Sequence, residues 1–438
     1  MTTARTSVPP ADDDTRPFAW FRDLGPRGRR AFAGAFGGWA LDSYDYWVLP
    51  LGLAAVISTL RISTGQAGML STTTLVMSAV GGALVGRLAD RFGRTRMLIV
   101  TVLTYAVFTV LCGFAPNYET LLVFRALQGF GFGGEWAVGA ILVSEYARAR
   151  HRGRTVAFVQ SAWAIGWAAA VLVYTLVFSL VSSDLAWRVL FWTGALPAVL
   201  VWYLRRKVTD APVATERRLV RRSFTEIWTG GLLPTTLLAS LLATGAQGGY
   251  YTLATWLPAY LATDRGLSVV GTGSYLALSI AGAFTGYLTG GYLTDRLGRR
   301  PTFVLFAALS AAVLVAFGQI PAGADAVLLV LTFPLGFTAS AIFSGFGTFL
   351  SELYPTPLRG TGQGFTYNAG RALGALFPAG AGFLAAEVGL GGAMAVGAAA
   401  YTLAAAALLG LPETRGRGLP DVEAQAVEQR PEPDSGRS

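Results

Sequence analysis

Long apolar runs constrain this chain more than any other feature of its sequence. About twenty mostly apolar residues are needed for a helix that crosses the hydrocarbon core of a bilayer. Such runs follow one another along almost the whole chain. Twelve membrane spans are therefore predicted, at residues 31–56, 68–87, 97–115, 120–144, 155–180, 185–204, 232–260, 268–292, 301–319, 324–350, 362–386 and 390–411.

The composition supports an all-α membrane protein. Hydrophobic residues make up 53% of the chain and charged residues 13%, against about 25% charged in ordinary soluble domains. The 54 glycines suit close packing of membrane helices. The net charge of +9 could suggest nucleic acid binding, but the basic residues form short clusters between apolar runs instead of one solvated face. We therefore expect a lipid bilayer as the environment and no nucleic acid partner.

The arginine clusters orient the expected spans, because cytoplasmic loops collect Lys and Arg. The loops after odd-numbered spans hold only Arg61, Arg188 and Arg265. The pattern predicts a multi-pass protein of the plasma (inner) membrane with both termini in the cytoplasm. The clusters on the cytoplasmic side are 27–30, 87–96, 148–154, 205–222, 296–300 and 415–417.

An internal repeat divides the chain into two halves. The motif from Gly86 to Arg94 recurs 205 positions later from Gly291 to Arg299. Duplicated halves are typical of secondary transporters. The repeat predicts a cytoplasmic tail over 1–30, a six-helix bundle over 31–204, a cytoplasmic linker over 205–231, a second six-helix bundle over 232–411 and a cytoplasmic tail over 412–438.

The sequence holds no pattern typical of an enzyme or a metal site. Gly129, Gly131 and Gly134 match a dinucleotide-binding spacing, but they lie inside an apolar helix, where helix packing explains them better. His151, the single histidine, has no metal-ligating neighbours in sequence. We expect no enzymatic activity, no metal and no cofactor, with a proton gradient as the driving force.

The duplicated Gly-x-Leu-x-Asp-Arg-x-Gly-Arg motif resembles the signature of the major facilitator superfamily, and the resemblance extends over about residues 30–415. Within that superfamily the chain looks most like the sialate:proton symporters and the monocarboxylate group, with aromatic acid:proton symporters next. The resemblance implies two halves that rock around a central site, and first-span carboxylates that couple protons. Ser43 and Trp47 depart from the aromatic acid symporters. The segments that carry the resemblance are 38–45, 125–136, 247–258 and 367–371.

Charged residues within the spans are candidates for coupling, because each costs about 2.5–3.5 kcal/mol on insertion scales. Asp42 and Asp45 share one face of the first span near its mid-depth. Two desolvated carboxylates so close favour binding a proton, so we expect the pair to carry the coupled proton. Arg125 and Glu135 in the fourth span are expected to take part in coupling. The alternative for each is an interhelical structural contact.

Arg371 lies near mid-depth in the eleventh span. Its planar guanidinium matches a carboxylate bidentately, so it is the expected ligand of an anionic substrate. The alternative is a structural ion pair with Asp42 or Asp45, and a proton on the aspartate would then free Arg371 for substrate. Five neutral polar residues are expected either to line the cavity near the substrate or to form structural hydrogen bonds between helices. They are Gln128, Gln247, Tyr250, Tyr251 and Asn368.

The charged loop motifs are predicted to form a cytoplasmic gate whose salt bridges break when the inner face opens. The alternative is a static anchor of topology. The gate residues are Gly86, Asp90, Arg91, Gly93, Arg94, Glu145 and Arg152 in the first half and Asp295, Arg296, Arg299, Glu352 and Arg359 in the second.

Together these features predict a monomeric, proton-coupled symporter that takes up a small organic anion by alternating access. A monocarboxylate, an aromatic acid or sialic acid would suit it. A sugar-type or drug-efflux carrier of the same superfamily is the alternative, since residues 412–416 resemble the ending of sugar porters. A membrane sensor without transport would require an added signalling domain, and the polar tail is too short to form one.

Overall fold

The computed structural model describes residues 21, 24–92, 94–133, 152–196, 198, 224–229 and 231–415. Every regular element within these ranges is a helix. The first half contains α2 (Gly25–Leu60), α3 (Thr64–Phe92), α4 (Arg94–Cys112), α5 (Tyr118–Phe132), α7 (Arg152–Leu180), α8 (Ser183–Trp192) and η3 (Thr193–Ala195). After η5 (Phe224–Trp228), the second half contains α10 (Leu232–Thr263), α11 (Val269–Arg296), α12 (Arg299–Gly318), α13 (Asp325–Ala341), α14 (Phe346–Glu352), η6 (Thr356–Leu358), α15 (Arg359–Gly374), α16 (Leu376–Ala393) and α17 (Ala395–Leu409).

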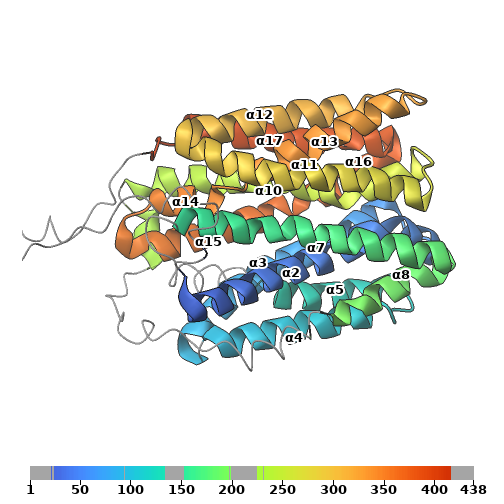
Figure 1. Cartoon of the computed structure of the whole chain (residues 1–438), viewed down its shortest axis with the longest axis horizontal. Helices are drawn as coiled ribbons and strands as arrows, with labels where there is room; N and C mark the ends of the chain where they lie inside the picture. Colours follow the sequence, from blue (N-terminus) through green and yellow to red (C-terminus); the bar gives the residue numbers. More distant parts are fainter. Residues whose placement is uncertain are drawn as a thin grey trace, which may run out of the picture.

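The helices form two bundles that lie side by side (Figure 1). Helices α2 to α8 make one bundle and α10 to α17 the other, and the two meet where α2 packs on α10, α3 on α15 and α16, and α7 on α11. The start of α2 and the segment that follows α17 lie at the same end of the molecule (Figure 1). We call this the terminal end, and the opposite end the far end.

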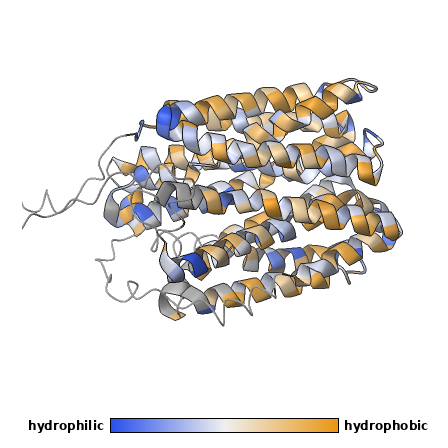
Figure 2. Cartoon of the chain, viewed as in Figure 1, coloured by the Kyte–Doolittle hydropathy of each residue, from blue (hydrophilic) through white to orange (hydrophobic). Residues whose placement is uncertain are grey.

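The helices follow the apolar runs of the sequence. Among the described residues, six helices are long and apolar enough to cross a membrane, and two shorter apolar helices accompany them. The expected division between the last two spans falls at Gly389, whose φ of 72° interrupts the helical backbone of α16. The most hydrophilic helix segments gather at the terminal end, whereas the helix bodies are mostly apolar (Figure 2).

The outer surface of the bundle is apolar as well. Leu172, Leu176 and Leu180, one turn apart along α7, are between 61 and 76% exposed. A stripe of this kind would favour aggregation in water, but it matches the hydrocarbon of a bilayer.

Two far-end arginines have structural partners. Arg188 donates to the carbonyls of Gly113 and Ala115, just after α4, at 3.0 and 2.7 Å. Arg265 donates to the carbonyls of Ile320 and Pro321, just after α12. A cation is favourable at the carboxyl end of a helix, so these arginines close the ends of α4 and α12.

The two halves are in close contact near the far end. Gly68 of α3 faces the backbone of α16 so closely that a Cβ at this position would lie 2.7 Å from the Pro378 oxygen and 2.8 Å from the Ala379 Cα. One turn on, the Thr72 hydroxyl donates to the Ala375 carbonyl at 2.5 Å. We call this contact between α3 and α16 the far-end seam.

Candidate functional site

A cavity with an empty volume of about 480 Å³ lies between the two halves. Helices α2, α5 and α7 contribute to its wall from one half, and α10, α11 and α15 from the other. The lining residues are Trp39, Tyr46, Phe132, Gln160, Trp163, Tyr250, Tyr251, Tyr287, Phe343, Tyr367 and Arg371.

Arg371 of α15 is the cation of this cavity. It is 3% exposed, and its Nη2 donates to the Tyr367 hydroxyl at 3.4 Å. Its guanidinium lies 5.0 Å from the centre of the Tyr367 ring and 5.9 Å from that of Phe132. Within the part of the chain that the structure describes, its Nε has no hydrogen-bond acceptor and no carboxylate lies within 4.0 Å of its nitrogens. The structural pairing with Asp42 or Asp45 considered from the sequence is therefore not observed.

Asp45 of α2 lies in a buried polar network inside the first half. Its Oδ1 accepts from the Thr109 hydroxyl of α4 at 2.6 Å, and its Oδ2 accepts from the Gln128 amide of α5 at 2.6 Å. The Gln128 oxygen in turn accepts from the Arg125 guanidinium. Asp45, Gln128 and Arg125 are all at most 3% exposed. Arg125 is thus linked to Asp45 through Gln128.

Thr109 can support either charge state of Asp45. Its hydroxyl lies 2.6 Å from the Asp45 carboxylate and 2.8 Å from the Tyr105 carbonyl, yet a threonine hydroxyl has only one proton to donate. With Asp45 ionised, the proton points to the carboxylate. With Asp45 protonated, the proton can turn to the Tyr105 carbonyl while the hydroxyl oxygen accepts from the carboxyl group.

Of the two other acidic residues expected to couple protons, the structure describes Asp42 but not Glu135. Asp42 lies one turn before Asp45 on α2 and is also 1% exposed. Glu135 lies outside the described residues.

The neutral residues expected near substrate fall into two groups. Tyr250 and Tyr251 of α10 line the cavity. Gln247 lies behind that wall, where it donates to the Tyr367 carbonyl at 3.0 Å and accepts from the Tyr251 hydroxyl at 2.9 Å. Asn368 donates to the Gly364 carbonyl on its own helix at 2.9 Å. Gln128, Gln247 and Asn368 are thus engaged in protein hydrogen bonds and are absent from the cavity lining.

Sequence reasoning missed most of the aromatic wall. Trp39, Asp42 and Tyr46 lie on one face of α2, at positions i, i+3 and i+7. That spacing could have pointed to the two aromatic residues. Trp163, Tyr287 and Phe343 carry no comparable signal, because an aromatic residue in an apolar span is as typical of the core as of a cavity.

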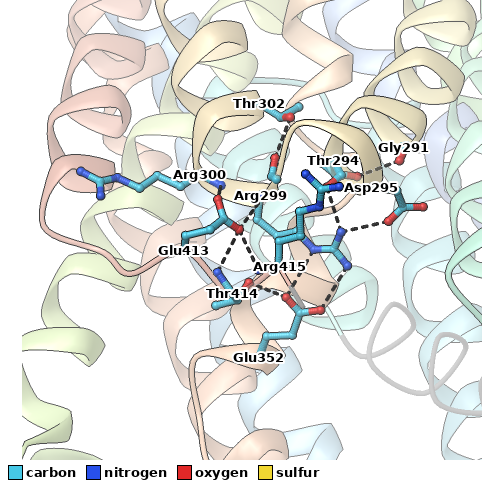
Figure 3. A network of polar contacts seen from close by, with 11 residues as sticks. Gly291, Thr294, Asp295, Arg299, Arg300, Thr302, Glu352, Glu413, Thr414 and Arg415 are labelled. Carbon is cyan, nitrogen blue, oxygen red and sulfur yellow. Dashed lines mark hydrogen bonds and ion pairs between the residues drawn. The ribbon is translucent and has the colours of Figure 1, made fainter. Parts of the chain in front are cut away.

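In the second half, three of the gate residues form a cluster of polar contacts (Figure 3). Arg299 pairs with Asp295 at 2.9 Å and with Glu352 at 3.3 Å. The Thr414 hydroxyl donates to Glu352 at 2.5 Å. These contacts join α11, α12, α14 and the segment after α17. Every member belongs to the second half.

Two further gate residues have other contacts. The guanidinium of Arg296 lies over the ring of Tyr292 at 4.7 Å. Arg359 donates to the Tyr354 carbonyl at 3.3 Å. The backbone of Gly86 belongs to α3. The side chains of Asp90, Arg91, Arg94 and Arg152, and the residues Gly93 and Glu145, lie outside the described part of the chain.

Glu413 closes the start of α12. Its carboxylate accepts from the backbone N–H groups of Arg299 and Arg300 at 3.0 and 2.9 Å, and from those of Thr414 and Arg415 at 2.9 and 2.8 Å. Partial burial acts to raise the pKa of Glu413, but the four N–H donors outweigh it and lower the pKa. A negative charge at a helix amino end is favourable, so the segment after α17 is held against the second motif copy.

Comparison with known proteins identifies the family. The sequence profile described as Major Facilitator Superfamily matches residues 35–290 and 273–433. The chain belongs to the major facilitator superfamily.

Relatives and solved structures of the superfamily cover nearly the whole chain. A probable 4-methylmuconolactone transporter of Cupriavidus pinatubonensis is 39% identical over 412 residues, which cover 92% of this chain and 95% of that protein. A niacin transporter of Acinetobacter baylyi is 30% identical over 378 residues, which cover 78% and 83%. The crystal structure of a D-xylose–proton symporter matches with a TM-score of 0.73 at 21% identity, over 89% of this chain and 99% of that one.

These findings confirm the predicted superfamily and the fold class of twelve transmembrane helices in two six-helix halves. The chain is a multi-pass membrane transporter and not an enzyme.

Proposed function

We propose that this transporter is a proton-coupled symporter that takes up a small organic anion by alternating access. The observation that carries the proposal is Arg371, a buried guanidinium that faces the central cavity without a carboxylate partner among the described residues. An uncompensated buried charge is costly. A substrate carboxylate would supply both the missing charge and acceptors that match the guanidinium fork.

The cavity wall indicates the kind of anion. Nine of its eleven lining residues are aromatic, and none is acidic. Aromatic rings pack favourably against flat unsaturated groups, whereas a sugar would require a hydrogen-bond partner for most of its hydroxyls. The relatives named for 4-methylmuconolactone and niacin point the same way, since both compounds combine a ring with a carboxyl group. We therefore favour a cyclic carboxylate over a sugar or a neutral drug.

The proton would bind at Asp45, apart from the substrate. Asp45 is buried behind the cavity wall, and its neighbour Tyr46 on α2 forms part of that wall. Protonation would neutralise Asp45 while Thr109 redirects its own proton, so no buried hydrogen bond needs to be lost. Movement of α2 against α10 would then connect occupancy of the cavity with the charge of Asp45. Symport of one proton with each monoanion would carry no net charge across the membrane.

Alternating access would proceed by rocking of the two halves around the cavity. The arginine distribution favours a cytoplasmic terminal end, so both termini would be cytoplasmic and the far end would face outward. Opening outward requires the far-end seam between Gly68 and Pro378 to separate. The cluster of Arg299, Asp295 and Glu352 would form the second half of the cytoplasmic gate.

Uptake into proteoliposomes tests the proposal. Radiolabelled nicotinate or benzoate should enter proteoliposomes faster than protein-free liposomes when the lumen is made alkaline relative to the medium, and a protonophore should abolish the accumulation. Excess benzoate should compete for uptake, whereas excess xylose should not. Accumulation that is indifferent to the pH gradient would refute proton coupling, and competition by xylose alone would favour a sugar carrier.

A further inference from the structure

The cavity wall contains hydrogen-bond donors that make no well-formed hydrogen bond to another described residue. Among the residues that the structure describes, the buried Tyr46 hydroxyl makes no well-aligned hydrogen bond, although the Thr255 hydroxyl lies near it, and the Nε of Arg371 has no acceptor. The indole N–H of Trp39 is a third such donor in the wall. Buried donors are normally satisfied, so the wall is prepared for a ligand that brings acceptors.

The other phenols near Tyr46 already have partners. The Tyr250 hydroxyl accepts from the Trp163 indole at 2.6 Å, and the Tyr251 hydroxyl donates to Gln247 at 2.9 Å. Tyr46 therefore differs from these two tyrosines in that its hydroxyl makes no well-aligned hydrogen bond.

Tyr46 and Arg371 flank the same ring. The ring of Tyr46 stacks on that of Phe132 with centroids 6.4 Å apart, and the Arg371 guanidinium lies 5.9 Å from the same centroid. Tyr46 also touches the Tyr251 ring, with centroids 6.1 Å apart. A flat ring held over Phe132 with its carboxylate on Arg371 would turn its opposite edge toward Tyr46.

We propose that Tyr46 is a specificity-determining residue that donates a hydrogen bond to a second acceptor on a cyclic carboxylate. The site then prefers ring acids that carry a carbonyl oxygen or a ring nitrogen away from the carboxyl group over ring acids that carry none. This inference rests on the proposed function, because it takes the carboxylate on Arg371 as given.

Nicotinate and benzoate form a matched pair of probes. The two share ring size and carboxylate, and only nicotinate has a ring nitrogen that can accept a hydrogen bond. Tyr46→Phe removes the hydroxyl and keeps the ring, so it should weaken nicotinate binding by about 2-fold to 10-fold relative to benzoate. Tyr251→Phe is the control, because the single proton of the Tyr251 hydroxyl is already donated to Gln247. It should change the two affinities by the same factor.

Equilibrium binding of both ligands to purified wild type and to both variants, at one pH, measures this ratio. Effects of Tyr46→Phe on folding or on Asp45 cancel in the ratio, since they act on both ligands. An unchanged ratio of nicotinate to benzoate affinity would overturn the assignment of Tyr46 and leave the organic-anion proposal intact. Failure of both acids to bind wild type would overturn the proposed function and this inference together.

Discussion

Replacement of Asp45 by Asn should separate substrate movement from proton movement. The carboxylate accepts two buried hydrogen bonds, from Thr109 and Gln128. Asn retains one oxygen acceptor but turns an NH₂ group toward the other donor. One charge-assisted bond is lost, which costs about 1.5–3 kcal/mol of stability. The cavity is lined by other residues, so substrate should still bind in the variant.

The size of the transport defect follows from the driving force. A gradient of one pH unit is worth about 1.4 kcal/mol for each coupled proton, which corresponds to about tenfold accumulation. Wild-type proteoliposomes under that gradient should reach about this ratio if one proton accompanies each anion. Asp45→Asn should accumulate substrate no faster than protein-free liposomes do under the same gradient, while exchange of labelled for preloaded unlabelled substrate continues.

Asp184→Asn is the matched control for this experiment. Asp184 accepts from Thr59 in an exposed hydrogen bond at the far end, remote from the network around Asp45. This variant should accumulate substrate as the wild type does. If Asp45→Asn also keeps the full pH-driven ratio, Asp45 does not carry the proton and the reasoning from its network is wrong.

Thr109→Val keeps the shape of the side chain but loses its hydroxyl, so it should slow proton-driven uptake by about tenfold or more, and Thr109→Ser should restore the rate. Equal uptake by both variants would refute the role of the hydroxyl. Gly68→Ile should wedge the far-end seam open, so that a membrane-impermeant maleimide added outside reaches a cysteine at Tyr287; unchanged labelling would contradict the assignment of the seam. Glu413→Gln should lower the melting temperature at neutral pH, because the carboxylate with its lowered pKa stabilises the fold only while it is ionised. The difference in melting temperature from wild type should shrink as the pH falls below about 4.5. A difference that stays constant across this range would refute the contribution of the charge.

The sequence predicts the helices because membrane spans depend on local composition. Apolar runs located α3, α7, α11 and α12 without knowledge of their neighbours. The depth of Arg371 could be counted along its span in the same way. These features need only the rise per residue and the cost of burying charge.

The partners of these residues could not be predicted, because they depend on how helices meet. Thr109 lies 64 positions from Asp45 and has no distinguishing sequence neighbours. Gln128 was a candidate for the cavity wall, but the packing of α5 on α3 and α4 turns it toward Asp45. Tyr46 reads as a core aromatic until its hydroxyl, which makes no well-aligned hydrogen bond, and its place in the cavity are known.

Binding of an acid and of its amide to wild type and to Arg371 variants tests the central claim most directly. Benzoate offers Arg371 a carboxylate, and benzamide keeps the ring without the charge. We predict that wild type binds benzoate far more tightly than benzamide, that Arg371→Lys weakens benzoate strongly because the guanidinium fork is lost, and that Arg371→Ala abolishes benzoate binding while benzamide changes little. If the substitutions weaken both ligands equally, Arg371 serves the structure alone and the account of an anion carrier is contradicted.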